Sequence, residues 1–82
     1  MTRVEALEVA RRSIEREWEY AYNRREELEH EYLELENQGR ESESRTANYY
    51  MRHWQNVMDE LHVAIRYLDD MIGEQYNAAD AA

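Results

Sequence analysis

The chain has 82 residues and a formal net charge of -9, and its ten basic residues are all arginine. Its length fits one domain, and its lack of cysteine and lysine excludes disulfides, thiolate metal sites and lysine-based covalent or P-loop chemistry. The acidity opposes direct binding to nucleic acid or to anionic membranes and favours a protein partner with a basic surface.

The first predicted element is a helix over residues 3–37. Apolar residues recur from Val4 to Leu35 at alternating spacings of three and four, a pattern typical of helices that pack on helices. Thr2 and Glu5 have the spacing of a capping box at its start. Gly39 suits the left-handed residue that closes a helix, so the first helix should end just before it.

A polar stretch at residues 38–44 predicts a turn, with Ser44 as the N-cap of a second helix. The second helix is expected over residues 45–75, because the same apolar spacing runs from Ala47 to Ile72. The segment 77–82 is predicted to be a loose tail.

These elements predict an all-α fold of one domain, an antiparallel two-helix hairpin over residues 1–82, with one continuous helix as the alternative. Antiparallel pairing about the break places opposite each other residues whose numbers add to about 82. Arg11, a charge in the apolar seam, needs an acidic partner there. We expect that partner to be Asp70.

The second helix carries a further apolar row beside its seam, which widens its apolar stripe beyond what one partner helix covers. A chain this short rarely builds a sufficient core alone, so we expect dimerisation into a four-helix bundle, with larger oligomers as an alternative. The predicted oligomer interface consists of Tyr50, Val57, Leu61, Ala64 and Met71.

Metal binding and catalysis receive little support from the sequence. Glu27 and His30 have the Glu-x-x-His spacing of helical di-iron sites, and Asp59 and His62 approximate it. The neighbouring Leu28 occupies the seam, however, so His30 should point away from the interior. No nucleophile–base pair is evident, and a two-helix scaffold offers little concave pocket. We therefore expect a non-enzymatic protein without cofactor or metal.

The strongest functional signal is the acidic outer face of the first helix. Residues 15–36 contain nine glutamates and three arginines, and exposed tyrosine is a residue type enriched in interface hot spots. This face is predicted to dock as an anionic rod on a basic surface, resembling nucleic acid in field and outline. The predicted partner-binding residues are Glu19, Tyr20, Glu26, Glu27 and Glu34.

In size, acidity and lack of catalytic motifs, the chain resembles the small acidic inhibitors that phages use against host nucleic-acid machinery. This resemblance implies a protein that masks a basic nucleic-acid-binding surface, and it assigns no residues. Without a membrane-spanning run, the expected location is the cytoplasm, which is the host cytoplasm for a phage protein. The alternatives are a structural or oligomerisation coiled-coil module and a carboxylate-rich metal-binding bundle.

Overall fold

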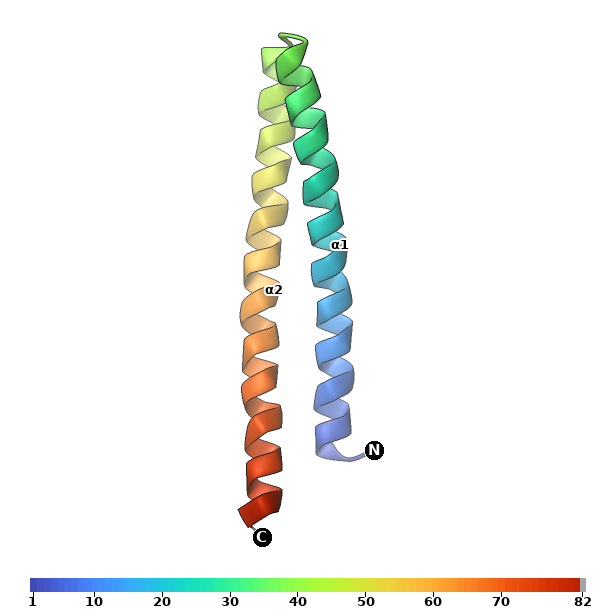
Figure 1. Ribbon diagram of the computed structural model, residues 1–82, viewed down its shortest axis with the longest axis vertical. Helices are drawn as coiled ribbons and strands as arrows, with labels where there is room; N and C mark the ends of the chain where they lie inside the picture. Colours follow the sequence, from blue (N-terminus) through green and yellow to red (C-terminus); the bar gives the residue numbers. More distant parts are fainter. Residues whose placement is uncertain (82) are drawn as a thin grey trace.

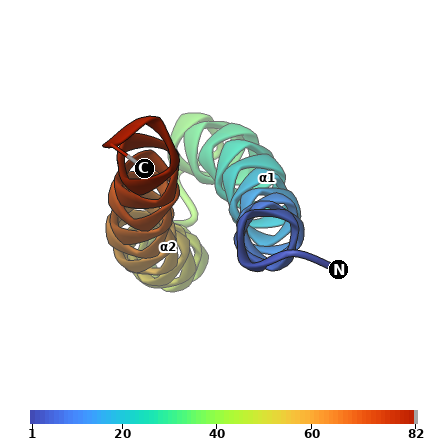
Figure 2. The same ribbon diagram turned by 90° about the horizontal axis from the view of Figure 1, so that it is seen from below.

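The computed structural model describes residues 1–81, with side chains through residue 78, and consists of two long helices, α1 (Arg3–Asn37) and α2 (Glu41–Ala81). The helices run antiparallel and side by side, so that both chain ends lie at the same end of the rod (Figure 1). Viewed end-on, they are inclined to each other (Figure 2). The molecule measures 65 × 17 × 13 Å. The predicted all-α two-helix hairpin is confirmed, and one continuous helix is excluded.

Helix α1 begins where the capping pattern predicted. The Glu5 backbone N–H donates to Thr2 Oγ1 at 3.1 Å, which satisfies one of the amides left free at a helix start. The Glu5 carboxylate accepts a hydrogen bond from the Thr2 hydroxyl at 3.1 Å. Thr2 therefore caps α1 through its side chain.

The turn between the helices depends on Gly39, whose φ of 71° lies in the left-handed region that favours glycine. Its backbone N–H donates to the Glu36 carbonyl, and that of Arg40 donates to the Leu35 carbonyl, both at 3.0 Å. These two bonds form a Schellman motif, which satisfies the last carbonyls of α1. The motif reverses the chain direction within the short segment between Asn37 and Glu41.

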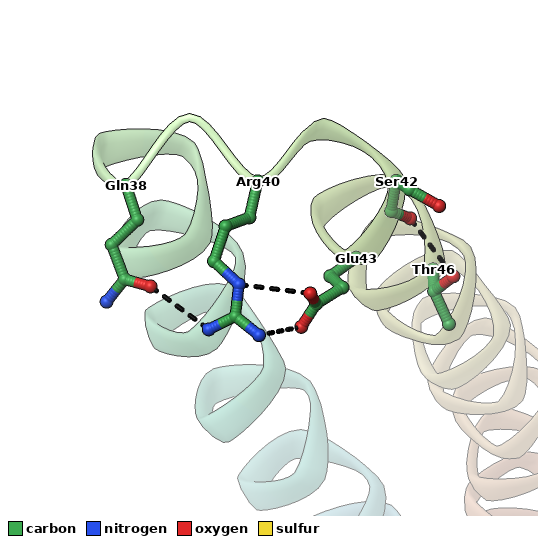
Figure 3. A network of polar contacts seen from close by, with 5 residues as sticks. All are labelled: Gln38, Arg40, Ser42, Glu43 and Thr46. Carbon is green, nitrogen blue, oxygen red and sulfur yellow. Dashed lines mark hydrogen bonds and ion pairs between the residues drawn. The ribbon is translucent and has the colours of Figure 1, made fainter.

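Helix α2 begins earlier than the sequence indicated. It starts at Glu41, so most of the predicted turn 38–44 is helical, and Ser44 is not its N-cap. At the turn, Arg40 donates to Glu43 at 3.0 Å from Nε and to Gln38 Oε1 at 3.2 Å from Nη1 (Figure 3). Glu41 and Glu43 lie in the first turn, where their negative charges interact favourably with the helix dipole and stabilise the start of α2. The first backbone bond of α2 runs from the Ser44 N–H to the Arg40 carbonyl at 3.0 Å, so Arg40 and not Ser44 stands at the start of the helix.

The far end of α2 extends through Gly73 to Ala81, beyond the predicted boundary at residue 75. Most of the segment 77–82 is therefore helical, and its last residue lies outside the described part of the chain. The alanine-rich end has high intrinsic helix propensity, and one glycine costs only about 1 kcal/mol. Within the described residues, neither helix has a stretch long and apolar enough to cross a membrane.

The fully buried core lies in the half of the rod nearest the turn. Seam residues towards the open end, such as Leu7, Ile14 and Leu68, are only half-buried, because a single neighbouring helix covers one side of each. The buried apolar residues are Ala21, Leu28, Leu35, Ala47 and Met58.

Ser44 is also buried at this end, with 1% of its surface exposed. Its hydroxyl lies 2.7 Å from Glu36 Oε1 and 2.9 Å from the Glu41 carbonyl oxygen. The contact with Glu36 ties the two helices together next to the turn. A residue predicted to cap a helix thus acts as a polar link inside the hairpin.

The charge predicted in the seam has an acidic partner, but not the expected one. Arg11 Nε donates to Asp69 Oδ1 at 2.5 Å and Arg11 Nη1 to Glu15 at 2.6 Å, so the predicted pairing with Asp70 is wrong. The hydrogen bond that Asp69 accepts, together with the negative charge of Asp69, raises the pKa of Arg11. Asp69 lies about 100° round α2 from the seam residue Leu68, whereas Asp70 lies about 200° round and so on the outer face. Asp69 is therefore the aspartate that can reach Arg11.

Candidate functional site

An apolar hollow lies where α1 and α2 meet near the middle of the rod. It has a volume of about 410 Å³, with Val57 and Leu61 of α2 in its lining. The ring of Tyr20 from α1 lies edge-on to Trp54 of α2, with centroids 5.6 Å apart. Tyr20 nevertheless remains 59% exposed. The two aromatic rings thus line a hollow that stays open to a partner.

A second hollow, of about 360 Å³, lies nearer the turn. Glu31 lines it from α1 and Tyr50 from α2, as Glu17 and Val57 line the first. Glu17 and Glu31 are 14 residues apart on α1, and Tyr50 and Val57 are 7 apart on α2. Residues separated by whole heptads lie on the same side of a helix, so both hollows open on the same flank of the hairpin. We call this flank, with its two hollows, the apolar groove.

The predicted oligomer-interface row follows the same groove along α2. Tyr50 is 50% exposed and Met71 is 38% exposed, while Val57, Leu61 and Ala64 are half-buried. Two of these five residues line the central hollow, and Tyr50 lines the other. The row is therefore an incompletely covered apolar surface, as its heptad phase predicted.

The opposite flank is closed by polar contacts between the helices. Arg11 bonds Asp69 there, and the Tyr76 hydroxyl donates to Glu8 Oε1 at 3.1 Å, which raises the pKa of Tyr76. We call this side the polar flank. Among the side chains that the structure describes, no hydrogen bond or ion pair joins α1 to α2 across the apolar groove.

The acidic face of α1 is more compensated than its composition suggests. Glu26 lies 2.8 Å from Arg25, and Glu27 lies 2.5 Å from Arg24. Such exposed pairs are worth little, but they lower the local field. Glu19 lines a further hollow together with Arg12, Glu15 and Arg16.

The other acidic residues of α1 divide by position. Within the described side chains, Glu17, Glu31 and Glu34 make no ion pair. Glu17 and Glu31 line the two hollows, and Glu34 follows Glu31 by three residues on the same side of the helix. These three glutamates lie beside the apolar groove. Four other glutamates of α1 also make no ion pair among the described side chains and lie elsewhere: Glu5, Glu8, Glu19 and Glu36.

The residues weighed for a metal site remain apart. The Glu27 carboxylate is held by Arg24, Asp59 Oδ1 accepts from Gln55 at 3.0 Å, and His30 and His62 are exposed. The described residues contain no group of three or more His, Asp or Glu side chains placed to hold a metal ion.

Three charged groove residues of α1, Arg16, Glu17 and Glu31, were absent from the predicted partner-binding set, and Trp54 was assigned to the seam alone. Arg16 and Glu17 precede Tyr20 by one helical turn, so the spacing that selects neighbours on a helix surface would have identified them. Of the predicted set, Tyr20 lines the groove and Glu34 lies beside it, whereas Glu19 lines a different hollow.

The arrangement offers apolar contacts, aromatic faces and peripheral carboxylates, which are the components of a binding surface for another protein. No protein-family model, curated protein or solved structure matches the chain.

Proposed function

We propose that this protein is a small, acidic, non-enzymatic interaction protein that binds a protein partner with a basic surface. The observation that carries the proposal is that Glu17 and Glu31, which make no ion pair among the described side chains, line an open apolar groove, with Glu34 one helical turn beyond Glu31. Opposite charge at the rim of an interface steers association and selects the partner, while apolar contacts in the centre supply affinity.

Nucleic-acid-binding proteins are among the proteins that have basic surfaces. The protein is therefore suited to act as an inhibitor that masks such a surface. The net charge of -9 concentrated on a rod 65 Å long supports this role. It equally disfavours direct contact of the protein with nucleic acid. A cytoplasmic location stays a prediction.

The proposal is tested by affinity capture from a nuclease-treated host lysate, with washes at low and high salt. We expect a basic protein to be retained at low salt and released at high salt. The double variant Glu31→Arg/Glu34→Arg should lose this retention. Asp59→Arg/Asp70→Arg makes the same change in net charge away from the groove and should keep it.

Retention by both double variants, or capture of nothing but further copies of the chain, would contradict this function. The second result would favour the alternative of a structural coiled-coil module. Circular dichroism on each variant ensures that a loss of capture is not a loss of helix.

A second candidate role for the apolar row is homodimerisation into a four-helix bundle. The chain exposes 6274 Å², whereas a compact protein of its mass exposes about 5,200 Å². The excess of about 1,000 Å² is comparable with the roughly 800 Å² that each partner buries in a standard interface. A monomeric mass by sedimentation at micromolar concentration would refute dimerisation.

A further inference from the structure

The apolar groove has the shape and length of a site for one more helix. From Tyr50 to Met71 the row extends about 32 Å along α2, at 1.5 Å per residue. Its floor is made of Val57 and Leu61, and the ring of Tyr20 stands on the α1 side. Grooves between two helices commonly take the apolar face of an amphipathic helix.

The polar contacts of the hairpin make this groove the open side. Arg11–Asp69 and Glu8–Tyr76 hold α1 and α2 together on the polar flank. A helix entering the groove therefore breaks none of these bonds. It would complete a three-helix arrangement whose third member comes from another chain.

The charges around the groove select the kind of helix. Glu17 and Glu31 line it, and Glu60 on α2 lies next to the row in heptad phase; none of the three makes an ion pair among the described side chains. Arg16 is the cation in the central hollow, and Arg24 is already paired with Glu27. The net charge of the side chains beside the groove is therefore negative.

A second copy of this chain would bring like charges together at this rim, which is unfavourable. A helix with lysine or arginine beside its apolar stripe would bring opposite charges instead. We infer that the apolar groove binds an amphipathic helix with basic flanks, supplied by the partner. This inference rests on the proposed function and deepens it, because it specifies the part of the basic partner that is recognised.

The test uses three synthetic helical peptides of about 21 residues, the number that matches the row. The first has a leucine stripe with lysine flanks, the second the same stripe with glutamate flanks, and the third lysine flanks with glutamine in the stripe. The protein carries Trp18→Phe, which leaves Trp54 in the groove as the only tryptophan. We expect a saturable blue shift of its fluorescence with the first peptide and at least tenfold weaker binding of the other two.

Two matched pairs of variants locate the site. Val57→Asp in the groove should weaken binding of the first peptide at least tenfold, whereas Val63→Asp on the outer face of α2, 53% exposed, should not. Tyr20→Ala removes an exposed groove side chain without opening the core. Tyr22→Ala, at a position 40% exposed and about 200° round α1 from Tyr20, is its counterpart outside the groove. Binding is measured in the same Trp18→Phe background, and helicity is checked for each variant.

Equal binding of the lysine- and glutamate-flanked peptides, or full binding by both groove variants, would overturn the inference. So would a dimer that Val57→Asp converts to a monomer and that does not bind the first peptide, because the occupant would then be a second copy. Salt-sensitive capture from lysate that persists in Val57→Asp and is lost in Glu31→Arg/Glu34→Arg would leave the proposed function intact and refute only the groove as its site.

Discussion

Replacing Gly39 with alanine should destabilise the hairpin even though the added methyl group meets no atom. A Cβ built at this position has nothing within 4 Å, so the cost comes only from the φ of 71°. Holding an L-residue in the left-handed region costs about 1–2 kcal/mol. We expect the free energy of unfolding, measured with urea and circular dichroism, to fall by that amount.

The same substitution should also favour the straight form of the chain. Alanine is about 1 kcal/mol better than glycine in a helix, so the balance between hairpin and continuous helix shifts by about 2–3 kcal/mol, or roughly 30- to 140-fold. A continuous helix over residues 3–81 would be about 120 Å long and would have to pair with a second chain. The hairpin is 65 Å long, so small-angle scattering separates the two forms.

Gly73 supplies the matched control. It lies within α2, its φ is not in the left-handed region, and an added Cβ has nothing within 4 Å. Gly73→Ala should therefore stabilise the protein by about 0.5–1 kcal/mol and leave its dimensions unchanged. If Gly39→Ala proved as stable and as short as the parent protein, the assignment of the turn to the left-handed glycine would be wrong.

Three further outcomes follow from the described contacts. Leu28→Ala, at a position 8% exposed, should lower the free energy of unfolding by about 2–4 kcal/mol in urea titrations, because it leaves a cavity in the most buried part of the seam. Ser44→Ala should cost about 1.5 kcal/mol by the same measurement, because it removes the hydrogen bond to Glu36. The pKa of Tyr76 is raised by the hydrogen bond and charge of Glu8, so Glu8→Ala should lower it in an NMR titration. Because the folded pKa of Tyr76 is the higher one, its contribution to stability is present below the pKa of an unfolded tyrosine and is lost as pH rises through the folded value.

The helices and their antiparallel pairing were predictable, because they depend on signals within the chain. Thr2 with Glu5 marks the start of α1, and Gly39 marks its end. The apolar spacing identifies which residues face the seam. These features are local or periodic, and each requires only helix geometry.

The start of α2 was not predictable in the same way. Ser44 has the side chain of a helix cap, and the residues around it are polar, so local chemistry favoured a longer turn. The Schellman motif at Gly39 makes the reversal in so few residues that the helix resumes at Glu41. Ser44 then falls inside the helix, facing Glu36. Such a choice between capping and bridging depends on the tertiary neighbour, which a single sequence does not provide.

The placement of Tyr20 was also beyond the heptad pattern. The pattern put it outside the seam, on a face of α1 otherwise polar, where it was predicted to bind a partner directly. Its ring lies against Trp54 and forms one side of the groove, and its contact with a partner stays a prediction. An aromatic side chain is long enough to lean from an outer position across the neighbouring helix, and heptad positions describe only where it starts.

The groove arises from a mismatch in width between the two helices. The apolar stripe of α1 is narrow, and it covers the seam of α2 but leaves the row of Tyr50, Val57 and Met71 partly exposed. The hairpin cannot shift to cover this row without breaking the bonds of the polar flank, such as Arg11–Asp69. We therefore propose that another chain covers the row, and the carboxylates beside it favour a basic helix over a second copy of this acidic chain.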